Sequence, residues 1–314
     1  MSRGASIFLL AVLLIALSVS AYLLYENLPF GARQELSIKN LSSSADNGES
    51  YAGNEKMQFY LNMRFAKLPI SYSINSECSA EKTGQMQRAI EIISERAEIS
   101  FAQASAESDI DIRCRELDKR EVRNMGYYVA GEGGPSEIIN TSIFYVITKG
   151  EILLLKESEC EEPIVSMHEL LHALGFDHSA NPLSIMYNVS DCRQKLTADI
   201  ISGLERIYSI ESLPDLYFSG INATKNGRYL SFYVEIRNRG LADAQGTTIS
   251  VYSSDEKVKS FDIDAIEIGA GVTLSVDNMR LPERNAKEVR FVIDAENSTM
   301  ELSEENNIAV LSVE

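Results

Sequence analysis

Histidine occurs only three times in this chain of 314 residues, and tryptophan does not occur at all. Basic residues are also scarce: 29 Lys and Arg stand against 46 Asp and Glu, which gives a formal net charge of −17. A protein that binds nucleic acid needs a basic surface that displaces the counterions of the phosphates. The charge balance therefore predicts no nucleic-acid partner. It indicates a soluble surface rather than a particular substrate.

Cysteine is scarce as well, and the four that occur form no C-x-x-C pair. This spacing argues against a zinc site built from thiolates. An even number of cysteines in an exported chain favours two disulfides over free buried thiols, with three connectivities open. Cys160 and Cys192 flank the histidines, so a bridge between them would hold that region together and leave Cys78 and Cys114 as the second pair.

One long apolar run exists, IFLLAVLLIALSVSAYLLY at 7–25, and it contains no charge. A helix needs roughly 20 such residues to cross a bilayer. Arg3 precedes the run and Glu26 follows it, so the positive-inside rule places residues from 26 onward outside the cytoplasm. A cleaved signal peptide is the alternative, but the apolar run continues past the small residues at 19–21 and favours an uncleaved anchor. We therefore expect a single-pass cell-membrane protein, with a secreted protein as the alternative.

Composition and periodicity divide the chain into an anchor or signal sequence at 1–25, a polar linker at 26–65, a mixed α and β unit at 66–211 and an all-β unit at 212–314. In the third part, alternation predicts strands and a 3.6-residue apolar period predicts helices. Strands are expected at 68–74, 99–105, 109–114 and 141–148, helices at 81–99, 162–176 and 195–210, and an irregular glycine-rich loop at 124–138. After 212, short alternating runs between turn residues predict an antiparallel sandwich of roughly seven strands.

All three histidines lie in one short stretch, HELLHALGFDH, at 168–178. In a helix, His168 and His172 project from one face, where two imidazoles can hold one Zn²⁺ at about 2.0–2.1 Å each. Glu169 is offset around the helix, which is the position of a general base acting on a water molecule. Gly175 can end the helix and let the chain turn back, so that His178 becomes the third ligand.

Three protein ligands leave one position of a tetrahedral ion open, as in a catalytic zinc site. The alternative is that HExxH arises by chance and its histidines are ordinary helix residues. The longer motif, with its glycine and third histidine, is much more specific, and we expect one catalytic zinc ion.

The motif resembles that of the metzincin clan of zinc endopeptidases, and HELLHALGFDHS followed by Pro182, Met186 and Tyr187 is similar to its matrixin branch. The resemblance covers about 66–210. It implies an α+β catalytic domain, with a twisted mixed sheet and an active-site helix, and a methionine turn in which Met186 packs beneath the metal. Tyr187 is a candidate to stabilise the oxyanion, although a structural role is favoured because it adjoins Met186. A protein or peptide substrate is implied, extended above the site helix along a strand edge near 141–149.

Four departures from the matrixin pattern limit what is carried over. Leu171 stands where the family has glycine, and Asn188 stands where it has proline beside the pocket for the scissile bond, so substrate preference cannot be inferred. No histidine remains for the family's second, structural zinc. No cysteine-containing propeptide is present to hold the zinc latent. Calcium binding is left open.

The last part of the chain resembles the CARDB domains of prokaryotic cell-surface proteins, through LPDL at 213–216, IRNRGLADA, and VIDAENSTMELSEENN before the last strand. The resemblance implies an Ig-like sandwich that serves as an adhesion or spacer module and contacts a cell-surface partner. The whole chain is thus expected to be a membrane-anchored, extracytoplasmic zinc endopeptidase. A surface adhesion protein with a non-proteolytic zinc domain, and a zinc hydrolase of non-peptide amides, are the alternatives.

Overall fold

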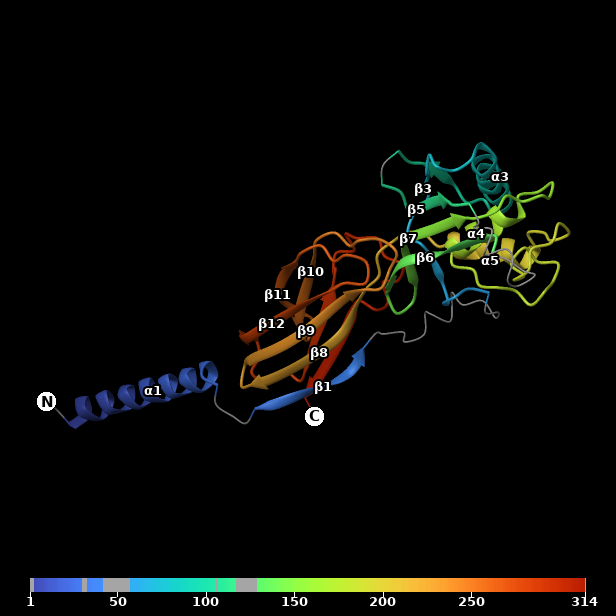
Figure 1. Cartoon of the computed structure of the whole chain (residues 1–314). Coiled ribbons are helices and arrows are strands. Elements are labelled where there is room, and N and C mark those ends of the chain that lie inside the picture. Colours follow the sequence, from blue (N-terminus) through green and yellow to red (C-terminus); the bar gives the residue numbers. More distant parts are fainter. Residues whose placement is uncertain (1–2, 30–32, 42–56, 106, 117–128, 314) are drawn as a thin grey trace. The chain divides into compact units, whose positions relative to one another are not determined.

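The structure, a computed structural model, describes residues 3–29, 33–41, 57–105, 107–116 and 129–313 (Figure 1). The chain divides into two compact units, which are described separately. The first contains 1–44, 216–238 and 244–314, and the second contains 45–215 and 239–243.

In its described residues the second unit combines a sheet with three helices, and these elements follow closely the local patterns of the sequence. They are β2 (Met63–Phe65), β3 (Ile70–Ile74), α3 (Ala80–Ala97), β4 (Phe101–Gln103), β5 (Ile110–Cys114), β6 (Gly131–Asn140), β7 (Tyr145–Leu154), α4 (Ile164–Ala173) and α5 (Ala198–Tyr208). The helix α3 is capped by Ser79, whose hydroxyl accepts a hydrogen bond from the Lys82 N–H.

The six-stranded sheet has the order β2-β7-β5-β3-β4, with every pair along this path parallel. The strand β6 pairs antiparallel along β7. One face of the sheet presents buried residues such as Ile110, Ile112 and Ile152 to the core. The same cluster contains Met86 and Ile93 of α3, six residues of α4, and two of α5. The core thus fixes the helix that carries the histidines against the sheet.

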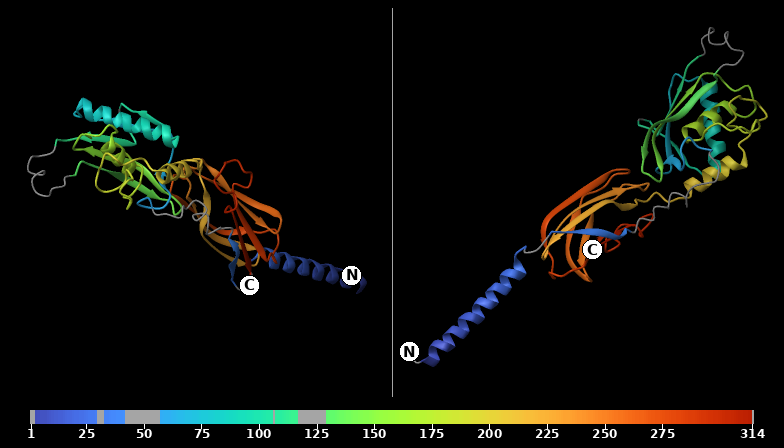
Figure 2. Two further views of the ribbon diagram at one scale, coloured as in Figure 1. Left: turned by 90° about the vertical axis from the view of Figure 1, so that its right-hand side faces the viewer. Right: turned by 90° about the horizontal axis from the view of Figure 1, so that it is seen from below.

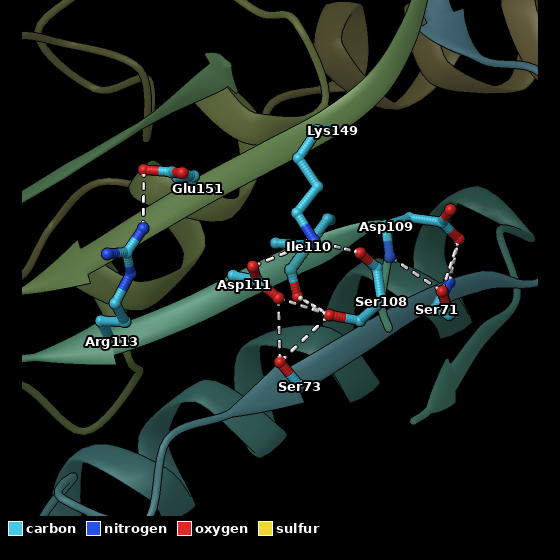
Figure 3. A network of polar contacts seen from close by, with 9 residues as sticks. All are labelled: Ser71, Ser73, Ser108, Asp109, Ile110, Asp111, Arg113, Lys149 and Glu151. Carbon is cyan, nitrogen blue, oxygen red and sulfur yellow. Dashed lines mark hydrogen bonds and ion pairs between the residues drawn. The ribbon is translucent and has the colours of Figure 1, made fainter. Parts of the chain in front are cut away.

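Polar side chains occupy the other face of the same strands (Figure 3). The Asp111 carboxylate accepts a hydrogen bond from Ser108 Oγ at 2.6 Å and lies 2.9 Å from Lys149 Nζ. Asp109 accepts hydrogen bonds from the Ser71 N–H and hydroxyl at 2.7 and 2.6 Å. The hydrogen bond from Ser108 is the main cause that lowers the pKa of Asp111 below its ordinary value. These contacts cross-link the parallel strands β3, β5 and β7 on a partly exposed face.

Two expectations about this unit are wrong. The segment 124–138 was expected to be an irregular loop, but residues 131–138 belong to the strand β6, and 124–128 lie outside the described residues. The segment 141–149 was expected to offer a free strand edge to the substrate. The strand β7, which contains most of it, is instead flanked by β6 on one side and by β2 and β5 on the other. The strand in closest contact with the site helix α4 is β6.

The first unit is a sandwich of antiparallel strands with the order β11-β10-β13-β14-β1-β8-β9-β12. The seven strands expected after 212 all form. They are β8 (Leu216–Asn226), β9 (Tyr229–Asn238), β10 (Thr247–Ser253), β11 (Glu256–Ile263), β12 (Gly271–Arg280), β13 (Glu288–Ile293) and β14 (Ile308–Val313). Buried side chains alternate along β9 and β13, as a strand with one core-facing side requires.

An eighth strand comes from the other end of the chain. The strand β1 (Gln34–Leu41) pairs antiparallel with β14 and with β8, and Figure 2 shows it in blue among the orange and red strands. The segment 26–65 was expected to be a polar linker, but it contains this strand, and Met63–Phe65 belong to the second unit. The signal was weak because only Leu36 of β1 is buried and its partners lie far away in sequence. The second unit is therefore an insertion between two strands of the sandwich.

The apolar run forms the helix α1 (Arg3–Asn27). Its segment Ile7–Asn27 has a mean hydropathy of 2.7 and buries none of that window against the protein. By length and composition it can cross a membrane, and its place near the N-terminus is equally that of a signal sequence.

Candidate metal centre and cleft

The helix α4 carries the first part of the histidine motif, and all ten of its residues are buried. It ends just before Gly175, which has a φ of +93°. A Cβ atom at this position would lie 2.6 Å from Met63 Cγ, so both the backbone conformation and the space require glycine. The chain then turns and returns to the helix with His178.

The three histidines meet at their Nε2 atoms. His172 Nε2 lies 3.0 Å from His168 Nε2 and 3.2 Å from His178 Nε2. Two imidazoles bound to one tetrahedral zinc at about 2.0–2.1 Å would place their nitrogens about 3.3 Å apart. The spacing of the three rings therefore fits a single zinc ion.

Backbone carbonyls determine which nitrogen of each ring faces the centre. His168 Nδ1 lies 2.7 Å from the Ile185 oxygen, and His172 Nδ1 lies 2.7 Å from the Phe176 oxygen. A neutral ring that donates its Nδ1–H to such a carbonyl presents the Nε2 lone pair, which is the arrangement of a metal-bound histidine. Sequence reasoning missed both carbonyls, because a backbone oxygen has no side-chain signature.

Burial also favours the neutral rings. It lowers the pKa of His168, and with the neighbouring His168 it lowers the pKa of His172 to about 4. Neutral imidazoles with converging lone pairs repel one another unless a cation lies between them. The donor set, the spacing and the protonation states thus all fit a divalent ion such as zinc.

Glu169 lies next to the first histidine with only 6% of its surface exposed. Burial raises its pKa to about 8, and the nearby Glu132 carboxylate adds to this shift. No residue that the structure describes donates a hydrogen bond to the Glu169 carboxylate. Buried carboxylates are usually hydrogen-bonded, so this one lies in a position prepared for an additional group.

Two glycines of β6 allow this strand to cover Glu169. A Cβ atom at Gly133 would lie 2.3 Å from the Glu169 carbonyl oxygen, and one at Gly131 would lie 2.7 Å from Glu169 Cγ. Any side chain at either position would push β6 away from α4. The alternation G-E-G within a strand was the sequence signal for this close approach, and it was read as a loop instead.

Met186 is buried in the core cluster that includes α4, with 1% of its surface exposed. Its carbonyl accepts a hydrogen bond from the Ser179 N–H at 2.8 Å, which joins the methionine turn to the residue after His178. Tyr187 is half-buried and lies outside the set of residues that line the cleft above the histidines. This position agrees better with a structural role for Tyr187 than with contact to an oxyanion.

A cleft of about 860 Å³ lies above the three histidines and Glu169. Its walls come from three segments, 129–133, 156–160 and 188–192. The first wall contains the start of β6, and the third follows the methionine turn. The cleft is therefore open to a ligand much larger than a water molecule.

A disulfide between Cys160 and Cys192 joins the second and third walls of the cleft. A second disulfide joins Cys78 to Cys114, next to α3 and β5. Of the three connectivities that the sequence left open, the structure has this one. The third wall is held further by the buried Gln194, whose side chain accepts from the Asp191 N–H and donates to the Val189 carbonyl.

Two family models match successive segments of the chain. The Matrixin model matches residues 64–209, and the CARDB model matches residues 213–310. No curated protein matches the chain significantly. The strand β1 and residues 57–63 lie outside both matched segments.

The chain is also similar to solved structures over part of its length. A domain described as part of a cell surface protein from Methanosarcina acetivorans is 17% identical, covers 32% of this chain and 91% of its own, and has a TM-score of 0.28. The CARDB domain of the PF1109 protein from Pyrococcus furiosus, in complex with di-metal ions, is 18% identical, covers 32% of this chain and 88% of its own, and has a TM-score of 0.26.

The matches to the two family models confirm the two resemblances and the fold class expected from the sequence. The cluster of His168, His172 and His178 lies inside the first matched segment, and its atoms are within reach of a single metal ion. Residues 64–209 are thus a matrixin domain, of the metallopeptidase type, and residues 213–310 are a CARDB domain.

Proposed function

We propose that this protein is a membrane-anchored, extracytoplasmic zinc endopeptidase. The observation that carries the proposal is the convergence of three Nε2 atoms, 3.0 and 3.2 Å apart, beside a buried Glu169 that no described residue hydrogen-bonds. The matrixin match supports the peptidase class. The cleft above the histidines supports a substrate of peptide size.

His168, His172 and His178 would hold the zinc ion, which would supply Lewis-acid activation of a water molecule and of the scissile carbonyl. Glu169 would take the proton of the attacking water and deliver it to the leaving amine. The charge of a nearby dication favours the ionised carboxylate, which counters the effect of burial on the pKa of Glu169. The cover of β6 over Glu169 would keep bulk water away from this proton transfer.

The substrate would lie extended along β6. This strand pairs with β7 on one side, and no described strand pairs with its other side. Residues 131–133 of β6 also line the cleft, so a peptide added at this edge would pass above Glu169. Backbone pairing of this kind gives affinity without fixing the side chains, which are read by pockets.

The helix α1 would anchor the chain, with both disulfides outside the cytoplasm, where they persist. The CARDB domain would act as an adhesion or spacer module. The strand β1 would connect this domain closely to the anchor, since it begins only a few residues after the apolar helix ends.

The alternative function is an adhesion protein whose zinc domain only binds. A binding site needs no base, yet this chain keeps Glu169 buried and without a hydrogen-bond donor among the described residues, which costs stability. That observation favours the peptidase.

The test uses the full chain in detergent with unfolded casein as substrate. We expect cleavage that stops when zinc is chelated, returns with about one zinc per chain, and is blocked by a peptide hydroxamate. Mass spectrometry of the products should show new amino and carboxyl termini at peptide bonds. Bound zinc with no cleavage of casein or of a peptide library would replace the proposal with the adhesion alternative.

A further inference from the structure

The segment Met57–Phe59 precedes the residues matched by the Matrixin model, and it runs beside the loop 175–177 that leads to His178. We call Met57–Phe59 the strap. The Asp177 N–H donates to the Met57 oxygen at 2.9 Å, and the Phe59 N–H donates to the Gly175 oxygen at 3.0 Å. Gln58 forms an antiparallel bridge with Phe176. The strap is thus paired, as a short strand, with all three residues 175–177.

The loop 175–177 controls two features of the metal centre. Phe176 supplies the carbonyl that binds His172 Nδ1, and Asp177 immediately precedes His178. The Asp177 carboxylate also accepts a hydrogen bond from the His178 N–H at 2.7 Å. A displacement of this loop would therefore move the support of one imidazole and the backbone of another.

Phe59 contacts the metal centre through its ring as well. It stacks on the His172 ring with centroids 5.6 Å apart and an interplanar angle of 20°. The rings of His168 and His178 both meet His172 edge-on, at 85° and 86°. The plane of His172 is thus held by a face contact with Phe59 and by the carbonyl of Phe176, and a rotation of this ring would turn Nε2 away from the ion.

Two residues of the strap, Met57 and Gln58, also contact other parts of the unit. The Gln58 side chain is buried, donates to the Met63 oxygen at 2.6 Å and accepts from the Met63 N–H at 3.3 Å. Met57 packs beside α5, where a Cβ atom at Gly203 would lie 3.0 Å from Met57 Cε. These contacts hold Phe59 in place.

We propose that the strap is part of the metal site and that Phe59 is a positioning residue, which orients the imidazole of His172 for the ion. This inference rests on the proposed function, because zinc is the ion whose affinity the strap sets. Outer-shell groups that orient a ligand typically change metal affinity by about 10–100-fold. Phe59 acts by stacking rather than by a hydrogen bond, so its removal is expected to weaken zinc binding about tenfold, at the lower end of this range.

The next residue offers a matched control. Tyr60 is also aromatic and also stacked, but its partner is the Tyr145 ring, with centroids 4.4 Å apart, and 48% of its surface is exposed. Loss of the Tyr60 ring removes an aromatic pair from the same segment without touching a ligand. Phe59→Leu and Tyr60→Leu therefore separate the support of His172 from the general stability of the strap.

The experiment measures the zinc dissociation constant of the full chain by competition with a chromogenic chelator. Phe59→Leu should bind zinc about tenfold more weakly than the wild type, whereas Phe59→Tyr, which keeps the ring, and Tyr60→Leu should remain within about twofold. With Co²⁺ in place of zinc, only Phe59→Leu should shift the visible absorption bands, because only there does the geometry of a ligand change.

The outcomes separate the two proposals. A wild type without zinc affinity contradicts the proposed function itself. A wild type that binds zinc no better than Phe59→Leu overturns the role of Phe59. Equal weakening by Phe59→Leu and Tyr60→Leu, or failure of Phe59→Tyr to restore affinity and the Co²⁺ spectrum, also overturns it, because the strap would then act only through stability.

Discussion

Two buried glutamates, one in each unit, differ in what their own chain offers them. Glu301 in the sandwich has 7% of its surface exposed, and its carboxylate accepts hydrogen bonds from the Leu216 N–H and from Asn307 Nδ2. Glu169 in the matrixin domain has 6% exposed and receives no hydrogen bond from any described residue. The same side chain at the same depth is thus bound in one unit and left open in the other.

The difference indicates that Glu301 has a structural role and that Glu169 is placed to receive another group. A buried polar group without a partner costs about 1–3 kcal/mol, and more when it is charged, so a fold keeps one where another group must be received. Glu301 joins the turn after β13 to the start of β8 and is fully used by the sandwich. Glu169 lines the same cleft as the three converging histidines, and in the proposed function its carboxylate would receive a reacting water molecule.

The largest expected effect is the loss of zinc affinity when the third histidine, His178, is removed. His178→Ala should weaken zinc binding by more than the roughly 10–100-fold typical of outer-shell mutations, because it removes a ligand of the ion. Cleavage of casein should disappear with the zinc. Isothermal titration with zinc measures the change, and Glu301→Gln serves as the control that keeps wild-type affinity. Unchanged affinity in His178→Ala would show that the cluster is not the metal site.

The next effect is a pH dependence of the free energy of unfolding that is due to Glu169. A carboxyl whose folded pKa is raised from 4.5 to about 8 stabilises the fold below its unfolded pKa, and this contribution is lost as the pH rises toward 8. Metal-free wild type should therefore lose several kcal/mol relative to Glu169→Gln between pH 4.5 and pH 8, since each pKa unit corresponds to about 1.4 kcal/mol.

Urea unfolding of both metal-free proteins across this range provides the measurement. His172, whose lowered pKa acts in the opposite direction, is present in both proteins and cancels in the difference. Zinc should reduce the difference, because a dication favours the carboxylate. Parallel curves for the two metal-free proteins would mean that Glu169 is not desolvated.

The two disulfides of the matrixin domain allow a second comparison, between one that lines the cleft and one that does not. Their sequence separations, 36 and 32 residues, are similar, so loss of either is expected to cost about 3–4 kcal/mol by the loop-entropy relation. Only Cys160 and Cys192 line the cleft, so the double serine variant of this pair should also raise the KM for peptides. The Cys78 and Cys114 double variant is the matched control. An equal rise of KM in both would contradict a role of the cleft walls in substrate binding.

The smallest effect is expected at the glutamate that the sandwich uses. Glu301→Gln keeps the size of the side chain but weakens its two charge-assisted hydrogen bonds, each of which contributes about 1.5–3 kcal/mol. A loss of about 2 kcal/mol in the free energy of unfolding should follow, with zinc affinity and cleavage unchanged. Urea unfolding and a casein assay give both values. A loss of cleavage without a loss of stability would reverse the assignment of the two glutamates.

Elements with strong local patterns could be predicted from the sequence. Such patterns depend only on residues a few positions apart in the sequence. Examples are the apolar period of α3, the alternation of β9 and β13, and the histidine motif of α4. The same motif was enough to predict which histidines meet, because a helix fixes His168 and His172 and a glycine turn returns His178.

What the sequence did not predict depends on contacts between distant segments. The strand β1 is held mostly by backbone pairing with β14, more than 260 residues later, and only one of its side chains is buried. The glycines of β6 were interpreted as a loop. They are needed because the strand lies close against α4, and this contact is between segments distant in sequence. The stacking of Phe59 on His172 joins residues that no local pattern relates.

The most direct test of the account is the rate of peptide cleavage by Glu169→Gln, measured together with its zinc content. The account predicts about one zinc per chain, stability no lower than that of the wild type, and a rate reduced by about 10²–10⁴-fold, the usual contribution of a general base. A variant that binds zinc and cleaves at the wild-type rate would contradict the assignment of Glu169 as the base.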